Sequence, residues 1–245
     1  MRTRAVLGAW AVAMMSVGAT HAAEGLATDV LPTAAGELRV TFVGHGTLMF
    51  EFGGKVIHVD PWAKLTDYSM LPKADLILVT HEHTDHLDKT AIAALRKEGT
   101  VVVGTAAVAE AVGGGLAMGN GEVKTFAGVK VEAVPAYNVV HMRAPGQPFH
   151  PKGVGNGYVL SFGDFRVYVA GDTENTPEMK ALKDIGCAFL PMNLPYTMTP
   201  AMVADAAKAF KPKILYPYHF GETDVSQLVD LLKDSGVEVR LRDLK

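Results

Sequence analysis

The sequence predicts an α/β (α+β) fold of four layers, an αββα sandwich in which two mixed sheets pack face to face under outer helices. Short runs rich in β-branched and aromatic residues alternate with helical stretches along the chain. They do so in two successive halves, each with strands first and helices after. No Ser/Pro-rich linker or run of charge divides the halves, so we expect a single domain over residues 23–245.

The composition is that of an ordinary globular protein. Of the 245 residues, 49% are hydrophobic and 20% are charged, which excludes disordered and collagen-like classes. A formal net charge of −3 gives no electrostatic reason to expect nucleic acid or an anionic membrane as a partner. We therefore expect neither of these partners, and the sequence leaves the oligomeric state open.

The first 22 residues have the pattern of a cleaved secretory signal peptide. Arg2 and Arg4 form a positive start, residues 5–19 are rich in Ala, Val, Met and Gly, and Ala22 and Ala23 offer a cleavage site. The apolar run is shorter than the ~20 residues that a membrane-spanning helix needs. We expect a periplasmic or secreted protein that does not interact with the membrane after the signal is removed.

The chain has one cysteine, although an exported protein could form disulfides. Cys187 lies in an apolar, strand-like run, which is typical of a small buried hydrophobic residue. We expect neither a disulfide nor a nucleophile at this position.

The elements of the first half follow from local patterns. Residues 24–36 are small and polar and are expected to be a loose leader. We then expect strands over residues 38–43, 48–52, 56–60, 75–80 and 101–103, and helices over residues 87–97 and 106–112. Gly53 and Gly54 are a strong hairpin signal between two of these strands. The Gly-rich residues 113–119 miss the spacing of a dinucleotide-binding loop and are expected to form a turn.

The second half continues with paired strands and then alternates. Residues 122–134 and 157–170 are expected to be two pairs of strands, the second turned at Gly163 and Asp164. After them we expect helices over residues 177–184, 200–210 and 225–235, and strands over residues 188–191, 214–218 and 237–241.

Candidate metal ligands are concentrated in residues 81–86, which read HEHTDH. They directly follow the buried strand 75–80, a rigid element that can direct loop side chains. In an extended segment alternate side chains share a direction, so His81 and His83 can bind one metal while the next turn directs Asp85 and His86 to a second. Imidazole and carboxylate ligands suit zinc, manganese or iron, and the absence of thiolate argues against a structural zinc or iron–sulfur site.

The HxHxDH motif, placed after a hydrophobic strand and before a helix, resembles the signature of the metallo-β-lactamase fold superfamily. Further motifs extend the resemblance over about residues 37–240: Gly44-His45, Asp60-Pro61, Gly171-Asp172 and Tyr218-His219. Within the superfamily the chain is similar to metal-dependent hydrolases related to the ascorbate-phosphate lactonases. Those proteins also carry a Tyr-Thr-Met sequence like residues 196–198.

The resemblance implies two divalent metal ions, zinc first, with manganese or iron as alternatives. It implies one site of His81, His83 and a third histidine, and a second site of Asp85, His86 and His219, with Asp172 bridging the two. His150 is the first choice for the third histidine, because its place before residues 158–162 is like the family's His-x-x-Gly element. His141 and Asn138 are the alternatives, since they lie closer to the preceding strand.

The activity that the resemblance implies is hydrolysis of a small-molecule substrate, an ester, lactone or phosphoester, by metal-activated water. Asp85 is the candidate general base or proton carrier, and Tyr196 and His45 are candidates for contacts to the oxyanion or the leaving group. No cysteine stands at the bridging position, which separates the chain from dinuclear β-lactamases that use thiolate there. The alternative is a metal-binding, non-catalytic or ligand-binding pseudoenzyme on the same fold. A nearly complete ligand set favours the enzyme.

Three other features are weaker. His58 alternates with apolar residues in a strand, and we expect it to support the site or the core without binding metal. Arg143 and Lys152 flank His150 and could bind an anionic group, or could be solvated loop charges. The alternating glycines of residues 153–157 are expected to let the backbone pass near the site.

Overall fold

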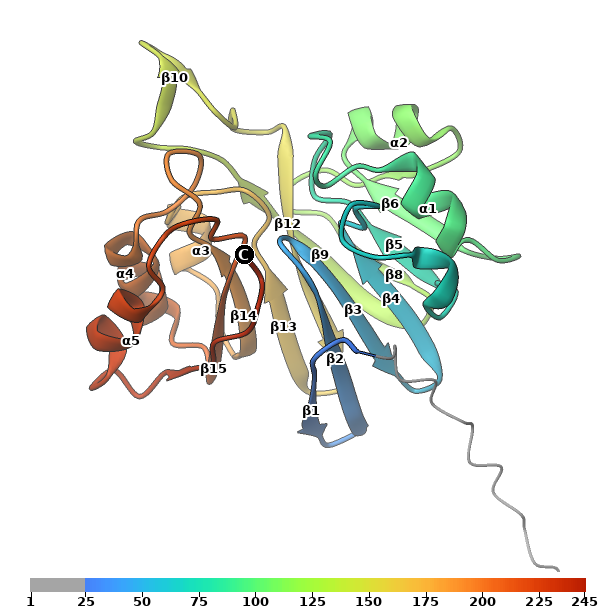
Figure 1. Ribbon diagram of the computed structural model, residues 1–245, viewed down its shortest axis with the longest axis horizontal. Helices are drawn as coiled ribbons and strands as arrows, with labels where there is room; N and C mark the ends of the chain where they lie inside the picture. The colour runs from blue at the N-terminus through green and yellow to red at the C-terminus, as the bar shows by residue number, and fades with distance from the viewer. Residues whose placement is uncertain (1–24) are drawn as a thin grey trace, which may run out of the picture.

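Residues 25–245 are described by the structure, a computed structural model in which two seven-stranded sheets pack face to face (Figure 1). Helices cover the outer surface of each sheet, so the expected αββα class is confirmed. The expected signal peptide lies outside the described residues. No helix within residues 25–245 has the length and hydrophobicity needed to cross a membrane.

The first sheet takes its strands in chain order. They are β1 (Thr28–Thr33), β2 (Gly36–Gly44), β3 (Thr47–Phe52), β4 (Lys55–Val59), β5 (Leu76–Leu78), β6 (Val101–Gly104) and β7 (Leu116–Ala117). The strands from β1 to β4 are antiparallel neighbours, whereas β4 to β7 run parallel. The elements beside its outer face are a 3-10 helix (Tyr68–Met70), α1 (Lys89–Leu95) and α2 (Ala106–Val112).

The second sheet has the order β16-β15-β14-β13-β12-β9-β8. Its strands are β8 (Val123–Phe126), β9 (Val129–Ala136), β12 (Gly155–Phe162), β13 (Phe165–Val169), β14 (Ile185–Pro191), β15 (Ile214–Tyr218) and β16 (Glu238–Val239). The outer helices are α3 (Pro177–Lys180), α4 (Pro200–Phe210) and α5 (Ser226–Leu232). Between β9 and β12 a small hairpin projects from the sandwich, made of β10 (Met142–Ala144) and β11 (Gln147–Pro148) (Figure 1).

Several expected boundaries differ from those observed. The prediction of a loose leader over residues 24–36 is wrong, because residues 28–33 form β1. This strand pairs with β2 and buries Leu31 in the core. An edge strand has a neighbour on one side only, and most of β1 is at least partly exposed, so its hydrophobic pattern is weak. The helices expected over residues 87–97 and 177–184 are both shorter in the structure. The first, α1, begins only after its N-cap Asp88 and ends at Leu95, and the second, α3, ends at Lys180.

Two further expectations were incomplete. The turn expected over residues 113–119 contains the two-residue strand β7, and the β10–β11 hairpin was not predicted at all. Strands this short carry too few residues to show an alternating pattern.

The main core lies between the two sheets. Phe189 stacks on Tyr216 with the ring centroids 5.0 Å apart, and Phe42 packs against both rings. Cys187 is fully buried in this core, and burial raises the pKa of its thiol well above the ordinary value. Its predicted role as a small hydrophobic residue is confirmed.

The glycines of β12 bring neighbouring backbone close together. A Cβ atom on Gly157 would lie 2.7 Å from the Ala170 carbonyl oxygen, and one on Gly155 would lie 3.1 Å from that of Ala136. Ala170 begins the loop that carries Asp172. Gly157 therefore lets β12 approach the start of a loop that reaches the candidate site.

We expect Gly157→Ala to lower the free energy of unfolding by about 1–3 kcal/mol, because the added methyl group would displace backbone. Urea denaturation of the two proteins measures the difference. Gly119→Ala is the matched control, since a Cβ there would approach no atom closer than 3.9 Å. An equal loss in both variants would show that the Ala170 contact is not the cause.

Candidate metal centre

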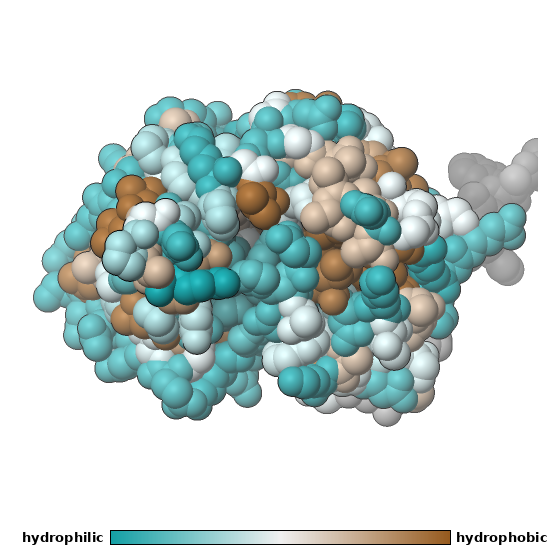
Figure 2. Space-filling view, turned by 90° about the horizontal axis from the view of Figure 1, so that it is seen from above, coloured by the Kyte–Doolittle hydropathy of each residue, from teal (hydrophilic) through white to brown (hydrophobic). Residues whose placement is uncertain are grey.

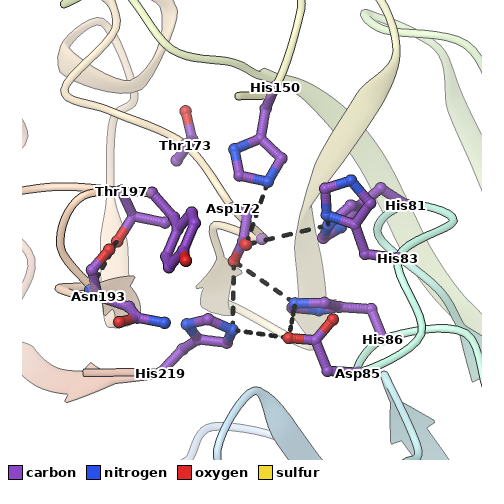
Figure 3. Close-up of polar contacts among 12 residues, drawn as sticks. His81, His83, Asp85, His86, His150, Asp172, Thr173, Asn193, Thr197 and His219 are labelled. Carbon is purple, nitrogen blue, oxygen red and sulfur yellow. Dashed lines mark hydrogen bonds and ion pairs between the residues drawn. The ribbon is translucent and has the colours of Figure 1, made fainter. Parts of the chain in front are cut away.

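The candidate residues meet at one end of the sandwich, beyond the ends of strands from both sheets. Residues 79–86 follow β5, Asp172 follows β13 and His219 follows β15. Because the carboxyl ends of neighbouring parallel strands lie at the same edge, their loops share this end. Figure 3 shows these side chains turned toward Asp172.

One cluster joins four of the expected ligands. Its members are His81, His83, His150 and Asp172, each offering an atom within 4.8 Å of the others. His81 Nε2 lies 3.0 Å from His83 Nδ1, and His150 Nε2 lies 3.3 Å from Asp172 Oδ2. Two nitrogen ligands on one tetrahedral zinc ion would be separated by about 3.3 Å, given zinc–nitrogen bonds of about 2.0 Å. The spacing therefore suits ligands of one ion.

A second cluster lies on the other side of the same carboxylate. Asp172 Oδ1 is 3.6 Å from His86 Nε2 and 3.8 Å from His219 Nε2. Asp85 Oδ2 in turn lies 3.5 Å from His219 Nε2 (Figure 3). Asp172 thus directs one oxygen toward each cluster.

Unpaired buried atoms test whether these residues fit a metal. Among residues 25–245, His86 Nε2, His219 Nε2 and Asp172 Oδ1 are buried and have no hydrogen-bond partner. Buried polar atoms without partners are unfavourable, and here they converge on one place. Imidazole nitrogen and carboxylate oxygen are good ligands for zinc and related divalent ions. The residues fit a metal centre.

The charges of Asp172 and His81 are consistent with this fit. Burial alone would raise the pKa of Asp172, but the surrounding histidines, His219 and His86 foremost, hold it well below its usual range. Burial lowers the pKa of His81 well below 6.5, and the neighbouring His86 adds to this effect. An ionised carboxylate and a neutral imidazole are the forms that bind metal.

The comparisons with known proteins agree with this geometry. A Beta-lactamase superfamily domain matches residues 39–219. The chain belongs to this superfamily. A metal-dependent hydrolase from Aeropyrum pernix is 32% identical over 199 residues, which cover 75% of this chain and 82% of that protein.

Two solved structures are also similar. One, from Parabacteroides distasonis, is described as a metal-dependent hydrolase. It is 49% identical to this chain and has a TM-score of 0.86, and the match covers 90% of this chain and 100% of that one. A metallo-hydrolase from Ignicoccus hospitalis shares the fold, with 24% identity, a TM-score of 0.71, and coverage of 84% and 95%. Together with the curated relatives, these findings identify this superfamily member as a metal-dependent hydrolase.

In this hydrolase Asp60 holds one histidine ring in place. Its Oδ1 accepts the Thr80 N–H at 2.7 Å, and its Oδ2 accepts the Thr80 hydroxyl at 2.7 Å and lies 2.8 Å from His86 Nδ1. Asp60 and His86 are both fully buried. With Nδ1 engaged, His86 presents Nε2 to the second cluster.

Asp60 also affects the charge of His86. Burial by itself would lower the pKa of this histidine, but the carboxylates of Asp172, Asp60 and Asp85 outweigh burial and raise it to about 9. In the sequence, Asp60 is marked only as part of the Asp60-Pro61 family motif. The signal that could have found its role is a carboxylate at the end of a buried strand, followed by proline.

The structure brings His150 to the first cluster and gives the two alternatives other positions. Asn138 Oδ1 accepts the backbone N–H of His150 at 2.7 Å and lies 2.8 Å from its Nδ1, so Nε2 points to Asp172. His141 lies instead beside Glu174, with its Nδ1 2.7 Å from Glu174 Oε1. Asn138, which was one alternative to His150 as the third ligand, therefore orients the His150 ring.

Glu174 is a further residue of the site, and no motif in the sequence marks it. Its buried carboxylate accepts backbone N–H groups of Val139 and Val140, each at 2.6 Å, and of His141 at 2.7 Å. It also accepts the Asn138 side-chain amide at 3.1 Å. Burial would raise the pKa of Glu174, but these hydrogen bonds hold it below its usual value. Glu174 therefore fixes the start of the segment that leads to the β10–β11 hairpin.

His45 and Tyr196 contact different residues of the site. His45 Nε2 is 3.2 Å from Asp85 Oδ2, and its ring centroid is 3.8 Å from that of His219. The next residue, Gly46, lets this backbone pass close to the His86 ring, because a Cβ there would lie 3.1 Å from that ring. Tyr196 is 45% exposed and packs edge-on against Phe149, with centroids 5.0 Å apart.

A cavity of about 450 Å³ opens beside the two clusters. It is lined by His83, Asp85, Arg143, Phe149, His150, Asp172, Asn193, Tyr196 and His219. The space-filling view of this end of the molecule shows hydrophobic side chains interspersed with hydrophilic ones around a hollow (Figure 2). The cavity can therefore hold a small molecule against Asp85 and Asp172.

The remaining candidates lie outside the clusters. His58 is fully buried, and its Nε2 lies 3.0 Å from the Pro72 carbonyl oxygen; burial lowers its pKa to about 4. It is a core residue, as expected. Gly155 and Gly157 let β12 lie close to neighbouring backbone. We assign them no contact with the ligand clusters.

We expect metal-free protein to lose stability as pH rises from about 6.5 through 9. The folded-state pKa of His86 is raised to about 9 from an ordinary 6.5, so its protonation stabilises the fold fully below pH 6.5 and not above 9. Asp60→Asn should move this loss to lower pH. Urea unfolding in chelator between pH 6 and 10 measures it, with the exposed Asp205→Asn as control. An unchanged pH dependence in Asp60→Asn would contradict the assignment.

We expect Asn138→Ala to weaken metal binding about 10- to 100-fold, because the His150 ring loses the group that orients it. Competition with a chromophoric chelator measures the affinity. Asn175→Ala is the control, since that side chain bonds Asp205 at the surface. Equal affinities in wild type and Asn138→Ala would show that His150 needs no such support.

Proposed function

We propose that this hydrolase holds two divalent ions, zinc by preference, and cleaves an ester, lactone or phosphoester. The observation that carries the proposal is the carboxylate of Asp172, which lies between two sets of ligand atoms and directs one oxygen to each. Histidine and aspartate ligands without thiolate suit zinc, manganese or iron. The N-terminal pattern supports the further proposal that the mature chain is periplasmic or secreted.

The ligand sets follow from the two clusters. His81, His83 and His150 would hold one ion, and Asp85, His86 and His219 the other, with Asp172 shared. Bound ions of this kind lower the pKa of water and polarise a carbonyl or phosphoryl oxygen.

Asp85 has the position and charge for proton transfer. Burial would raise its pKa, but hydrogen bonding to His219 and His45 lowers it far below its usual range, so the carboxylate is ionised at neutral pH. Its side chain is 32% exposed and lines the cavity, where it can accept a proton from an attacking water and pass it to the leaving group. His45, 3.2 Å away, holds the carboxylate in place.

Tyr196 is suited to contact the substrate. It lines the cavity together with three histidines, and its contact with Phe149 restrains the ring. Its hydroxyl can donate a hydrogen bond to an oxyanion or a leaving-group oxygen.

The test combines metal analysis with a panel of lactone, aryl ester, phosphodiester and lactam substrates, each with and without chelator. We expect two ions per chain, loss of turnover in chelator, and recovery when zinc is restored. One ion or none, with no turnover of any substrate, would contradict the proposal.

The role of Asp85 has its own test. We expect Asp85→Asn to lower kcat about 10²- to 10⁴-fold at matched metal content. The control is Glu82→Gln in the same loop, because Glu82 is exposed and outside the ligand clusters. Full turnover by metal-loaded Asp85→Asn would show that another group carries the proton.

A further inference from the structure

We propose that Arg143 selects substrates by binding an anionic group, a carboxylate or a phosphate, in the cavity beside the metal centre. The inference rests on the proposed function, since it names the class of substrate for that site. Arg143 would be a specificity-determining residue, separate from the groups that bind metal or carry protons.

Arg143 is the only lysine or arginine among the residues that line the cavity. The two carboxylates that also line the cavity, those of Asp85 and Asp172, lie against the histidine clusters. Among residues 25–245, Arg143 makes no ion pair with a carboxylate. Its positive charge is therefore available to a ligand in the cavity.

Lys152 provides the contrast. It flanks His150 on the other side, but its Nζ lies 2.7 Å from Glu178 Oε1 and 3.3 Å from the Tyr137 hydroxyl. It is also absent from the cavity wall. Of the two cations that flank His150, the structure thus leaves only Arg143 for an anion in the cavity.

Aromatic packing restrains the Arg143 side chain. Its guanidinium lies over the Phe149 ring, 5.8 Å from the centroid, and Phe149 packs edge-on against Tyr196. A guanidinium that stacks on a ring keeps its N–H edges free for a carboxylate or phosphate. Phe149 directly precedes His150, so this stack is next to a ligand of the first cluster.

The backbone that carries Arg143 is also fixed at its start. Glu174 accepts the N–H groups of Val139, Val140 and His141, the residues that lead into β10. Glu174 lies two residues from Asp172, so one loop positions both the shared carboxylate and the start of the hairpin. The distance between the metal centre and the cation is thereby restricted, as selection among small substrates requires.

The test compares two aryl esters with the same leaving group, 4-nitrophenyl acetate and mono(4-nitrophenyl) succinate, on the metal-loaded full chain. We expect wild type to prefer the succinate. Arg143→Gln should lower kcat/KM for the succinate about tenfold, mainly because KM rises. The same variant should change kcat/KM for the acetate less than about twofold. Arg143→Lys should keep part of the preference, because it keeps the charge and loses the planar fork.

The control variant is Lys152→Gln, which removes the same charge from the other side of His150. It should leave the ratio of the two esters unchanged. Equal losses for both esters in Arg143→Gln, no loss for either, or the same shift in Lys152→Gln would overturn the inference.

A binding measurement separates this inference from the proposed function. Calorimetry with succinate, and separately with glycerol 3-phosphate, needs no turnover. About tenfold weaker binding of either ligand to metal-loaded Arg143→Gln would support the anion site, and would show which anion it prefers, even if neither ester is cleaved. Equal affinity of wild type and Arg143→Gln for both ligands would overturn it.

Discussion

The buried carboxylate of Asp172 is the charge on which the rest of the site depends. It is 6% exposed, and four histidines surround it. An ionised carboxylate is costly to bury unless positive or hydrogen-bonding groups compensate. Because its two oxygens face different histidine clusters, compensation requires both clusters to be in place together. Compensation of this one buried negative charge thus requires histidines on loops from both sheets.

The loop that carries Asp172 is held from several sides. The Gly171 N–H donates to the Tyr218 hydroxyl at 2.8 Å, and a Cβ on Gly171, where φ is +65°, would lie 2.9 Å from the Asn156 carbonyl oxygen. Glu174 then fixes the segment that leads to the hairpin. The same few residues therefore position the metal side of the cavity and the wall that faces the substrate.

The side chains that orient the ligands follow one pattern. Asp60 engages Nδ1 of His86, and Asn138 engages Nδ1 of His150, so each ring presents Nε2 to Asp172. Such partners fix both the orientation and the tautomer of a metal-binding histidine. The shared fold and the curated relatives identify a metal-dependent hydrolase, while the cavity beyond the ligands decides which substrate can bind.

The sequence by itself predicted the two sheets with outer helices and the candidate metal ligands of residues 81–86, because strand periodicity and dense ligand motifs are local patterns. It missed β1, an edge strand whose hydrophobic pattern is weak, and the β10–β11 hairpin, whose strands are too short to show a pattern. Only the tertiary structure placed His150 in the first cluster, His141 beside Glu174 and Asn138 beside the His150 ring, and gave Glu174 and Asp60 their roles. Those roles consist of contacts between residues far apart in the chain, which no local pattern records.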